Sequence, residues 1–274
     1  MTTKKAYVVG SNVSVSLSPT IFQYWFDKYK LDAEYGYIET KEESFEEEIK
    51  LILKEDNLCG LNITIPFKER IISHLTKIDK HATKIGAVNC VTINNNFIEG
   101  TNTDWSGFKD SLDYFEDNRY DKIKIKRDVA IVIGYGGSAK AIIYSLKSIG
   151  YRKILVFNRT FEKIKNLKNV LPRKLEELPA IAPLADLIVN TVPAKDFIDR
   201  VLYSLRPNDM FNILGYDIVY NNETNFLRRF MSNNSIRGIY LLVHQAAPCF
   251  HRWFGVKPII DKNIFKSLTG SRRP

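Results

Sequence analysis

The sequence has few cysteines and no long apolar run, and each shortage excludes a class of protein. Its three cysteines, Cys59, Cys90 and Cys249, lie far apart and lack metal or redox spacing. We therefore expect no metal site and a reducing cytoplasm, where disulfides are rare. No apolar stretch approaches the roughly 20 residues that span a bilayer, so we expect no membrane association. Gly10 ends the first apolar run too early for a secretory signal.

Acidic residues are also in the minority, because 40 lysines and arginines face 31 aspartates and glutamates. The formal charge of +9 could attract nucleic acid, or a phosphate-bearing cofactor and an acidic substrate. The clearest basic run, residues 122–127, lacks the interleaved aromatic side chains of a single-strand binding surface. The sequence carries none of the usual nucleic-acid-binding motifs. We interpret the charge as a lysine-rich surface and expect no nucleic-acid partner.

Strand and helix patterns alternate along the whole chain, which predicts an α/β fold with mostly parallel sheets. In the first part we expect a helix opening at Pro19, a helix over 44–53, strands over 6–9, 35–38 and 61–65, and a hairpin of 87–93 with 97–99. In the second part we expect strands over 129–133, 154–157, 187–189, 210–214 and near 236–238, and helices over 140–149 and 240–253. We interpret the charged, tyrosine-rich segment 114–128 as a hinge region between two blocks.

Residues 128–160 carry a complete dinucleotide-binding βαβ pattern. The apolar strand leads into Gly-Tyr-Gly-Gly-Ser-Ala at 134–139, and a helical stretch follows. The first glycine permits a tight turn, the second lets backbone N–H groups approach a pyrophosphate, and Ala139 is small enough for close helix packing. The helix N-terminus then offers its amides to the anion. Strand, loop, helix and second strand occur in order, so we expect the cofactor to contact Gly134, Gly136, Gly137 and Ser138.

Specificity for the cofactor is expected at the end of the second strand. An NAD site usually places an acidic residue there, whereas a 2′-phosphate calls for cations and neutral donors. Asn158, Arg159 and Thr160 supply such donors, and Lys163 follows one turn later. A guanidinium pairs with phosphate through two charge-assisted hydrogen bonds. The segment therefore predicts NADP; the alternative makes Arg159 a solvated turn residue and Thr160 a helix N-cap.

Polar residues also gather at the strand ends of the first block. Ser14, Ser16 and Ser18 alternate before a helix start and could hold a carboxylate, although such a loop is more often a simple cap. Lys68 lies just past a strand that ends near Pro66, and Asp104 closes a second polar cluster. A lysine and an aspartate that converge would form a proton-transfer pair, but each alone would be a surface charge.

Together these motifs resemble the shikimate dehydrogenase family in order and spacing over essentially the whole chain. The most specific segments contain Lys68 and the Asn-Thr-Asp sequence that ends at Asp104. The matching segments are 16–19, 60–68, 86–89, 102–108, 158–160, 217–224 and 238–255.

The resemblance implies NADPH-dependent reduction of 3-dehydroshikimate to shikimate in aromatic amino-acid biosynthesis. Lys68 and Asp104 would be the catalytic pair, with Lys68 protonating or hydrogen-bonding the developing alkoxide. The other site residues that it implies are Ser16, Ser18 and Tyr220 at the substrate carboxylate, Thr64, Asn89 and Gln245 at the ring hydroxyls, and Gly238 at the cofactor.

The resemblance also implies two domains and a small-molecule substrate as the only partner. The substrate domain would comprise residues 1–108 completed by 239–274, and a Rossmann-type NADP-binding domain would comprise 109–238. The family includes monomers and homodimers, and the sequence favours neither.

Several positions depart from the family's usual residues. Val15 and Phe22 stand where the family has histidines, Val192 stands where it has threonine, and Tyr135 and Leu241 replace alanine and methionine near the cofactor. None removes a proposed catalytic group, but together they suggest weaker cofactor contacts or a shifted substrate preference. The alternatives are therefore a dehydrogenase for quinate or a related polyol carboxylate, or a non-catalytic NADP-binding regulator.

Overall fold

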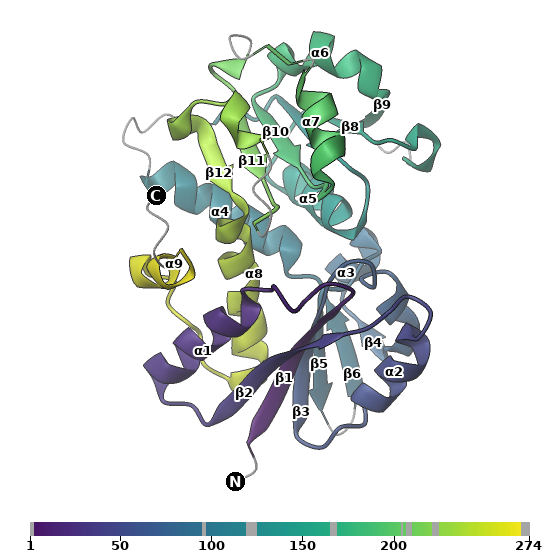
Figure 1. Cartoon of the computed structure of the whole chain (residues 1–274), viewed down its shortest axis with the longest axis vertical. Coiled ribbons are helices and arrows are strands. Elements are labelled where there is room, and N and C mark those ends of the chain that lie inside the picture. Colours follow the sequence, from purple (N-terminus) through teal and green to yellow (C-terminus); the bar gives the residue numbers. More distant parts are fainter. Residues whose placement is uncertain are drawn as a thin grey trace. The chain divides into compact units, whose positions relative to one another are not determined.

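The computed structural model describes residues 3–94, 97–118, 125–164, 169–203, 205–206, 210–220 and 225–269. The chain divides into two compact units, which are Met1–Asp104 with Leu242–Pro274, and Trp105–Leu241 (Figure 1). These limits differ by a few residues from the domain limits that the resemblance implies. Each unit contains one six-stranded sheet, so the predicted α/β class is confirmed.

The sheet of the first unit has the order β2-β1-β3-β5-β6-β4. β1, β2 and β3 pair in parallel, whereas the hairpin strands β5 and β6 run antiparallel to each other, as the sequence predicted. Residues 95 and 96 of the hairpin lie outside the described residues. The strands are β1 (Lys4–Gly10), β2 (Ala33–Glu39), β3 (Leu58–Ile63), β4 (Lys77–Ile78), β5 (Cys90–Asn94) and β6 (Phe97–Thr101).

β3 ends at Ile63, two residues before the predicted end, which corrects the sequence interpretation. The amide of Phe67 donates to the carbonyl of Thr64 at 2.9 Å, so the chain turns over these residues. Pro66 within the turn has no N–H to give to a neighbouring strand. The turn places Lys68 just beyond the C-terminal end of β3.

Two helices of the first unit, α1 (Ser18–Tyr29) and α2 (Phe45–Ile52), form where the sequence placed them. Both have apolar residues at helical spacing, and their buried sides carry bulky side chains such as Trp25 and Phe45. The short α3 (Lys80–Ile85) and α9 (Lys262–Leu268) were not predicted. An aspartate caps each of them, Asp79 and Asp261, by accepting hydrogen bonds from first-turn amides.

α8 (Gly238–Phe254) is the predicted final helix, and its second half completes the core of the first unit. Gly60 of β3 lies directly under the indole of Trp253. A Cβ atom at this position would collide with the ring, so this close approach requires glycine. The indole N–H also donates to the carbonyl of Val91 at 3.0 Å. α8 is thus fixed against β3 and β5, which sets the position of every side chain on this half of the helix.

The sheet of the second unit is entirely parallel, with the order β12-β11-β10-β7-β8-β9. The chain winds from the central β7 to one edge and then from β10 to the other, as in a Rossmann domain. The strands are β7 (Val129–Ile133), β8 (Lys153–Phe157), β9 (Val170–Arg173), β10 (Leu187–Asn190), β11 (Leu214–Asp217) and β12 (Ser235–Arg237). Its longer helices are α4 (Asp104–Asn118), α5 (Gly137–Ser148) and α7 (Lys195–Tyr203), and α6 (Leu178–Ile181) is short.

Two predictions for this unit were wrong. The strand expected over 210–214 lies at Leu214–Asp217, because residues 210–213 form a turn in which the Ile213 amide donates to the Met210 carbonyl at 3.1 Å. The segment 114–128 is not the hinge between the two units, because the chain passes from the first unit to the second between Asp104 and Trp105 and α4 continues to Asn118. Part of this segment, 119–124, lies outside the described residues, as does half of the basic run.

Candidate active site

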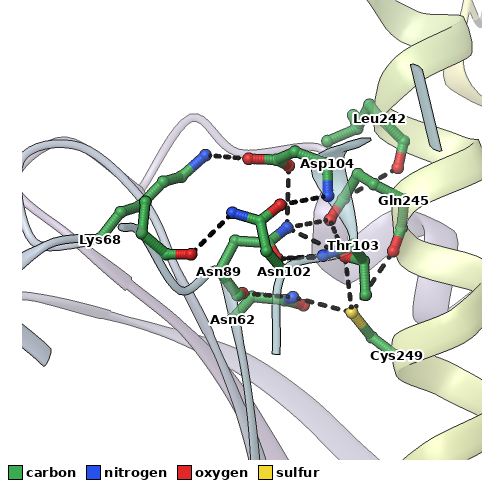
Figure 2. Close-up of polar contacts among 10 residues, drawn as sticks. Asn62, Lys68, Asn89, Asn102, Thr103, Asp104, Leu242, Gln245 and Cys249 are labelled. Carbon is green, nitrogen blue, oxygen red and sulfur yellow. Dashed lines mark hydrogen bonds and ion pairs between the residues drawn. The ribbon is translucent and has the colours of Figure 1, made fainter. Parts of the chain in front are cut away.

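Lys68 and Asp104 form a nearly buried ion pair in the first unit (Figure 2). The ammonium nitrogen lies 2.6 Å from Asp104 Oδ2, and the side chains are only 10% and 8% exposed. The turn after β3 delivers Lys68, and Asp104 begins α4. The two residues are 36 positions apart, and the structure brings them together as the sequence reasoning required.

The backbone around this pair is held by one buried asparagine that the sequence reasoning left without a role. Asn102 Oδ1 accepts a hydrogen bond from the Asp104 amide at 3.0 Å. Its Nδ2 donates to the carbonyl of Ala87 at 2.9 Å, and the next amide, Val88 N, donates to the carbonyl of Lys68 at 2.8 Å. A short chain of hydrogen bonds therefore fixes the backbones that carry both charged side chains.

Asn89 is the centre of the group, and its side chain is buried against three oxygens. Nδ2 lies 2.8 Å from Asp104 Oδ1, 2.9 Å from Thr103 Oγ1 and 3.2 Å from Gln245 Oε1. Its Oδ1 accepts from the Thr103 amide at 2.6 Å. An amide NH2 has only two hydrogens. Asn89 alone therefore cannot satisfy all three oxygens, and the Thr103 hydroxyl, 3.4 Å from Gln245 Oε1, can donate to the third.

Gln245 approaches this group from α8 (Figure 2). Its Nε2 donates to the carbonyl of Leu242 at 2.9 Å, one turn earlier in the helix. Because the amide nitrogen is engaged there, the oxygen Oε1 faces Asn89 and Thr103. The fixed position of α8 against β3 thus determines where this oxygen lies.

The other substrate residues expected in the first unit lie at neighbouring chain turns. Ser18 is buried at the start of α1, and its amide donates to Ser16 Oγ at 3.2 Å. Thr64 follows β3, and its amide donates to the carbonyl of Val9. Within the described residues, no hydrogen bond joins Ser16, Ser18 or Thr64 to Asn89 or to its three oxygen partners. Val15 is 55% exposed beside the serines.

Two of the three cysteines of this unit are poor candidates for nucleophiles. Burial raises the pKa of the Cys59 thiol to about 11. Burial also holds the pKa of the Cys90 thiol well above its ordinary value. Both therefore remain protonated at neutral pH, and the thiolate is the reactive form. The described residues also contain no cluster of three histidine, cysteine or acidic side chains that could hold a metal ion.

The glycine-rich loop of the second unit joins β7 to α5. Gly134 has φ of +108°, a conformation that favours glycine, and a Cβ there would collide with Thr191. Gly136 caps α5 and has open space around its Cα, while Gly137 and Ser138 form the first turn. The open space and the first-turn amides of α5 are what a pyrophosphate needs, so these residues fit a dinucleotide.

Thr191 supplies a hydroxyl one residue before Val192, which stands where the family has threonine. Its hydroxyl donates to the carbonyl of Ile133 at 2.7 Å, and its side chain packs against Gly134. The hydroxyl at this point of the chain therefore supports the glycine-rich loop. Tyr135 of the loop lies 5.8 Å, centroid to nitrogen, from the ammonium of Lys140. Both contacts lie within the second unit.

The segment after β8 presents exposed cations. Asn158 Nδ2 donates to the carbonyl of Thr160 at 3.0 Å, which closes the turn that carries the exposed Arg159. Thr160 precedes a short 3-10 helix (Phe161–Lys163), but its side chain makes no capping hydrogen bond. Thr160 thus occupies the N-cap position without capping the helix through its hydroxyl, and the exposed Arg159 agrees with both the cofactor interpretation and its alternative. Lys163 is exposed at the end of that helix.

Two further predicted residues belong to the second unit. Tyr220 is partly buried in the segment after β11, and Thr224 of the same motif lies outside the described residues. Gly238 begins α8, where a Cβ would lie 2.9 Å from the carbonyl oxygen of Asp217. Glycine is thus required at Gly238 for packing within the protein, in addition to any role at the cofactor.

Sequence and structure comparisons point to one family. The family model described as the shikimate dehydrogenase substrate binding domain matches residues 8–91, and the one described as shikimate / quinate 5-dehydrogenase matches residues 118–202. The shikimate dehydrogenase (NADP(+)) of Bartonella henselae is 33% identical over 95% of this chain and 91% of its own length. That of Pelagibacter ubique is also 33% identical, over 97% and 99% of the two chains.

Solved structures agree with this comparison. The shikimate dehydrogenase of Aquifex aeolicus superposes with a TM-score of 0.82 at 28% identity, covering 98% of each chain. That of Thermotoga maritima gives 0.78 at 31% identity, covering 97% of this chain and 98% of its own. A Thermus thermophilus shikimate 5-dehydrogenase solved in complex with NADP(H) and shikimate gives 0.75 at 26% identity, covering 97% and 98%.

Proposed function

This chain belongs to the shikimate dehydrogenase family, and from that membership we propose that it reduces 3-dehydroshikimate to shikimate with NADPH. The class, an NADP-dependent oxidoreductase acting on a CH–OH group, follows from the family. The observation that carries the proposal is the nearly buried Lys68–Asp104 ion pair, whose carboxylate accepts from Asn89, which in turn contacts Gln245. A proton-donating pair beside a cluster of amide and carboxylate groups suits a polyhydroxylated ring ketone.

Lys68 is the proposed proton donor. NADPH, when bound, supplies the hydride to the ring carbonyl carbon, and the carbonyl oxygen gains negative charge as the C=O double bond is lost. The Lys68 ammonium donates a proton or a strong hydrogen bond to that oxygen, which completes the hydroxyl. Asp104 holds the ammonium in place at 2.6 Å.

Asp104, Asn89 and Gln245 are proposed to bind the ring hydroxyls. The Asn89 amide nitrogen lies 2.8 Å from Asp104 Oδ1 and 3.2 Å from Gln245 Oε1, so the three side chains form one polar cluster. A site that matches hydroxyls one by one discriminates strongly against analogues lacking them. Thr64 is proposed to join this group, and Ser16 and Ser18 to hold the substrate carboxylate together with Tyr220.

The second unit is proposed to bind NADP. The loop residues Gly134, Gly136, Gly137 and Ser138 would hold the pyrophosphate, with Gly238 nearby. Asn158, Arg159, Thr160 and Lys163 would bind the 2′-phosphate. This assignment is supported by the parallel Rossmann sheet, the open space at Gly136 and the exposed cations after β8. The first unit correspondingly serves as the substrate domain.

Steady-state rates with shikimate and quinate, each with NADP+ and NAD+, test the proposal. We expect the highest kcat/KM for shikimate with NADP+. The matching family model is described as shikimate / quinate 5-dehydrogenase, so quinate is the second candidate substrate. A higher kcat/KM for quinate with NAD+ would overturn the assignment, and turnover of neither substrate would favour a non-catalytic NADP-binding role.

We propose a cytoplasmic location for this protein. The three cysteines are free thiols, which fits a reducing cytoplasm. Among the described residues, no helix combines the length and the apolar character needed to cross a membrane. The proposed partner is the small-molecule substrate alone, bound by a monomer or a homodimer.

A further inference from the structure

A second layer of polar residues lies behind Asn89, and its centre is Asn62 on β3 (Figure 2). Successive side chains of a strand point to opposite faces, so Asn62 shares the face of Gly60, which packs under Trp253 of α8. Its side chain is buried, with 6% of the residue exposed. A buried amide must find partners for its donors and its acceptor.

The donor of Asn62 is directed at the backbone of Asn89. Nδ2 lies 3.1 Å from the Asn89 carbonyl oxygen, which also accepts from the Ile63 amide at 2.9 Å. Two donors on one carbonyl fix the peptide plane of Asn89. The side chain of Asn89 leaves from the same residue, so its approach to Asp104 depends on how firmly that plane is held.

The acceptor of Asn62 is held from the other side. The hydroxyl of Tyr35 donates to Asn62 Oδ1 at 2.8 Å, and the ring of Phe22 stacks on Tyr35 with centroids 3.8 Å apart. This contact orients the amide, so that Oδ1 faces β2 and Nδ2 faces Asn89. Phe22, which stands in place of one of the family's histidines, thus supports the orientation of the Asn62 amide.

Asn62 also reaches α8. Its Nδ2 lies 3.2 Å from the sulfur of Cys249, which in turn contacts Thr103 Oγ1 at 3.4 Å. The Cys249 thiol also bonds to the carbonyl of Gln245 at 3.3 Å. Asn62 therefore joins the residues that carry the Asn89 amide and the Gln245 oxygen, which come from separate elements of the unit.

We propose that Asn62 is a positioning residue, which sets Asn89 and Gln245 at the distances from Asp104 needed to bind a ring hydroxyl. This inference deepens the proposed function and rests on it. A displacement of about 1 Å at a reacting centre can lower the rate about 100-fold. Removal of the Asn62 amide would leave the Tyr35 hydroxyl and the Cys249 thiol without one buried partner each and would free the Asn89 carbonyl from one of its two donors.

The test compares Asn62→Ala with Trp25→Phe. Trp25 is a buried core residue of the same unit that packs on Phe22 and Phe250, and its indole nitrogen makes no hydrogen bond to the described part of the chain, so its truncation weakens packing beside Phe22 but removes no hydrogen bond of Asn62. Kinetics are measured well below each variant's Tm. We expect Asn62→Ala to lower kcat/KM for shikimate by 10-fold or more and to leave the KM for NADP+ within twofold. Trp25→Phe should leave both constants within twofold.

Asn62→Asp supplies a readout that general destabilisation would not move, and it serves if Asn62→Ala does not fold. The substitution keeps the size of the side chain but replaces the donor with a carboxylate oxygen that repels the Asn89 carbonyl. Burial raises the pKa of a carboxyl group, and its protonated form regains one donor. We expect the activity of this variant relative to the wild type to rise as the pH falls.

The outcomes separate this inference from the proposed function. If the wild type oxidises shikimate and both Asn62 variants match it at every pH, the positioning role is wrong and the proposed function stands. If the wild type acts on neither substrate, the proposed function fails, and a crystal structure of Asn62→Ala decides the inference. An Asn89 amide displaced from Asp104 and Gln245 supports the positioning role, and an unmoved amide overturns it.

Discussion

The Lys68 ammonium lies 2.6 Å from Asp104 Oδ2, and both side chains are close to nine-tenths buried. Water can therefore screen neither charge effectively, and each depends on the other to offset the cost of its desolvation. Asn89 donates to the second oxygen of the same carboxylate at 2.8 Å, so both oxygens of Asp104 are engaged.

Lys68→Ala is expected to lower kcat by a factor of 10²–10⁴, the usual contribution of positioned proton transfer. Lys77→Ala is the matched control, because Lys77 is 64% exposed in an ion pair with Glu99 of the same unit. Steady-state oxidation of shikimate by NADP+ measures both variants. Unchanged turnover in Lys68→Ala would show that another group donates the proton.

Asp104→Ala is expected to destabilise the protein by about 3–5 kcal/mol, because it leaves a buried ammonium without its counter-charge. The double variant Lys68→Met/Asp104→Ala removes both charges and should recover part of that loss, although it remains inactive. Urea unfolding of the single and double variants measures the difference. Equal stability of the two would indicate that water reaches the ammonium and that the pair is not effectively buried.

Arg159→Ala is expected to raise the KM for NADP+ by 10-fold or more, since a hydrogen bond to a charged group contributes about 1.5–3 kcal/mol. Lys163→Ala should act in the same direction with a smaller effect. The KM for shikimate and the rate with NAD+ should change little. Arg152→Ala, at a 73% exposed arginine of the same unit, is the control. An Arg159→Ala variant whose kcat/KM falls equally with NADP+ and with NAD+ would exclude a role for Arg159 at the 2′-phosphate.

Asp261→Asn tests a charge that stabilises α9. The ion pair with Lys28 lowers the pKa of Asp261 to about 2, helped by hydrogen bonds from Tyr24 and from the amides of Ile264 and Asn263. Because the folded pKa lies below the unfolded value of roughly 4, the stabilisation is complete above that value and is lost as the pH falls through about 2.

We therefore expect Asp261→Asn to lower the free energy of unfolding by about 1 kcal/mol at pH 6, after allowance for partial solvent screening. The gap between the variant and the wild type should close as the pH falls from 4 towards 2. Urea unfolding across this range measures it. A gap that is constant with pH would mean that the carboxylate charge does not stabilise the fold.

Local patterns were sufficient for the part of the fold that depends on neighbouring residues. β7, its glycine-rich loop, α5 and β8 form where the sequence placed them, because buried parallel strands and a helix start have strong local signals. β9 was missed because it is short, lies at the sheet edge and contains Pro172, which argues against a strand. β11 begins at Leu214 instead of at the predicted residue 210, because the apolar residues before it form a turn.

The site was predictable only in the residues that belong to recognisable motifs. Lys68, Asp104, Asn89 and Gln245 were all named from motifs, and the structure brings these four into one hydrogen-bonded group. The layer behind them was not foreseen, because the Asn62–Cys249 contact joins residues 187 positions apart. No local pattern carries such a contact, which exists only once α8 has packed on β3.

α8 begins in the second unit and ends in the first, so the first unit is encoded at both ends of the chain. During translation, residues 1–104 leave the ribosome without Trp253 and Phe250, whose rings complete their core. Residues 105–241 must be synthesised in between, which takes on the order of ten seconds at typical elongation rates. The nascent first unit therefore waits with its α8-binding face exposed, while the Rossmann unit has nearly all its residues before the C-terminal segment appears.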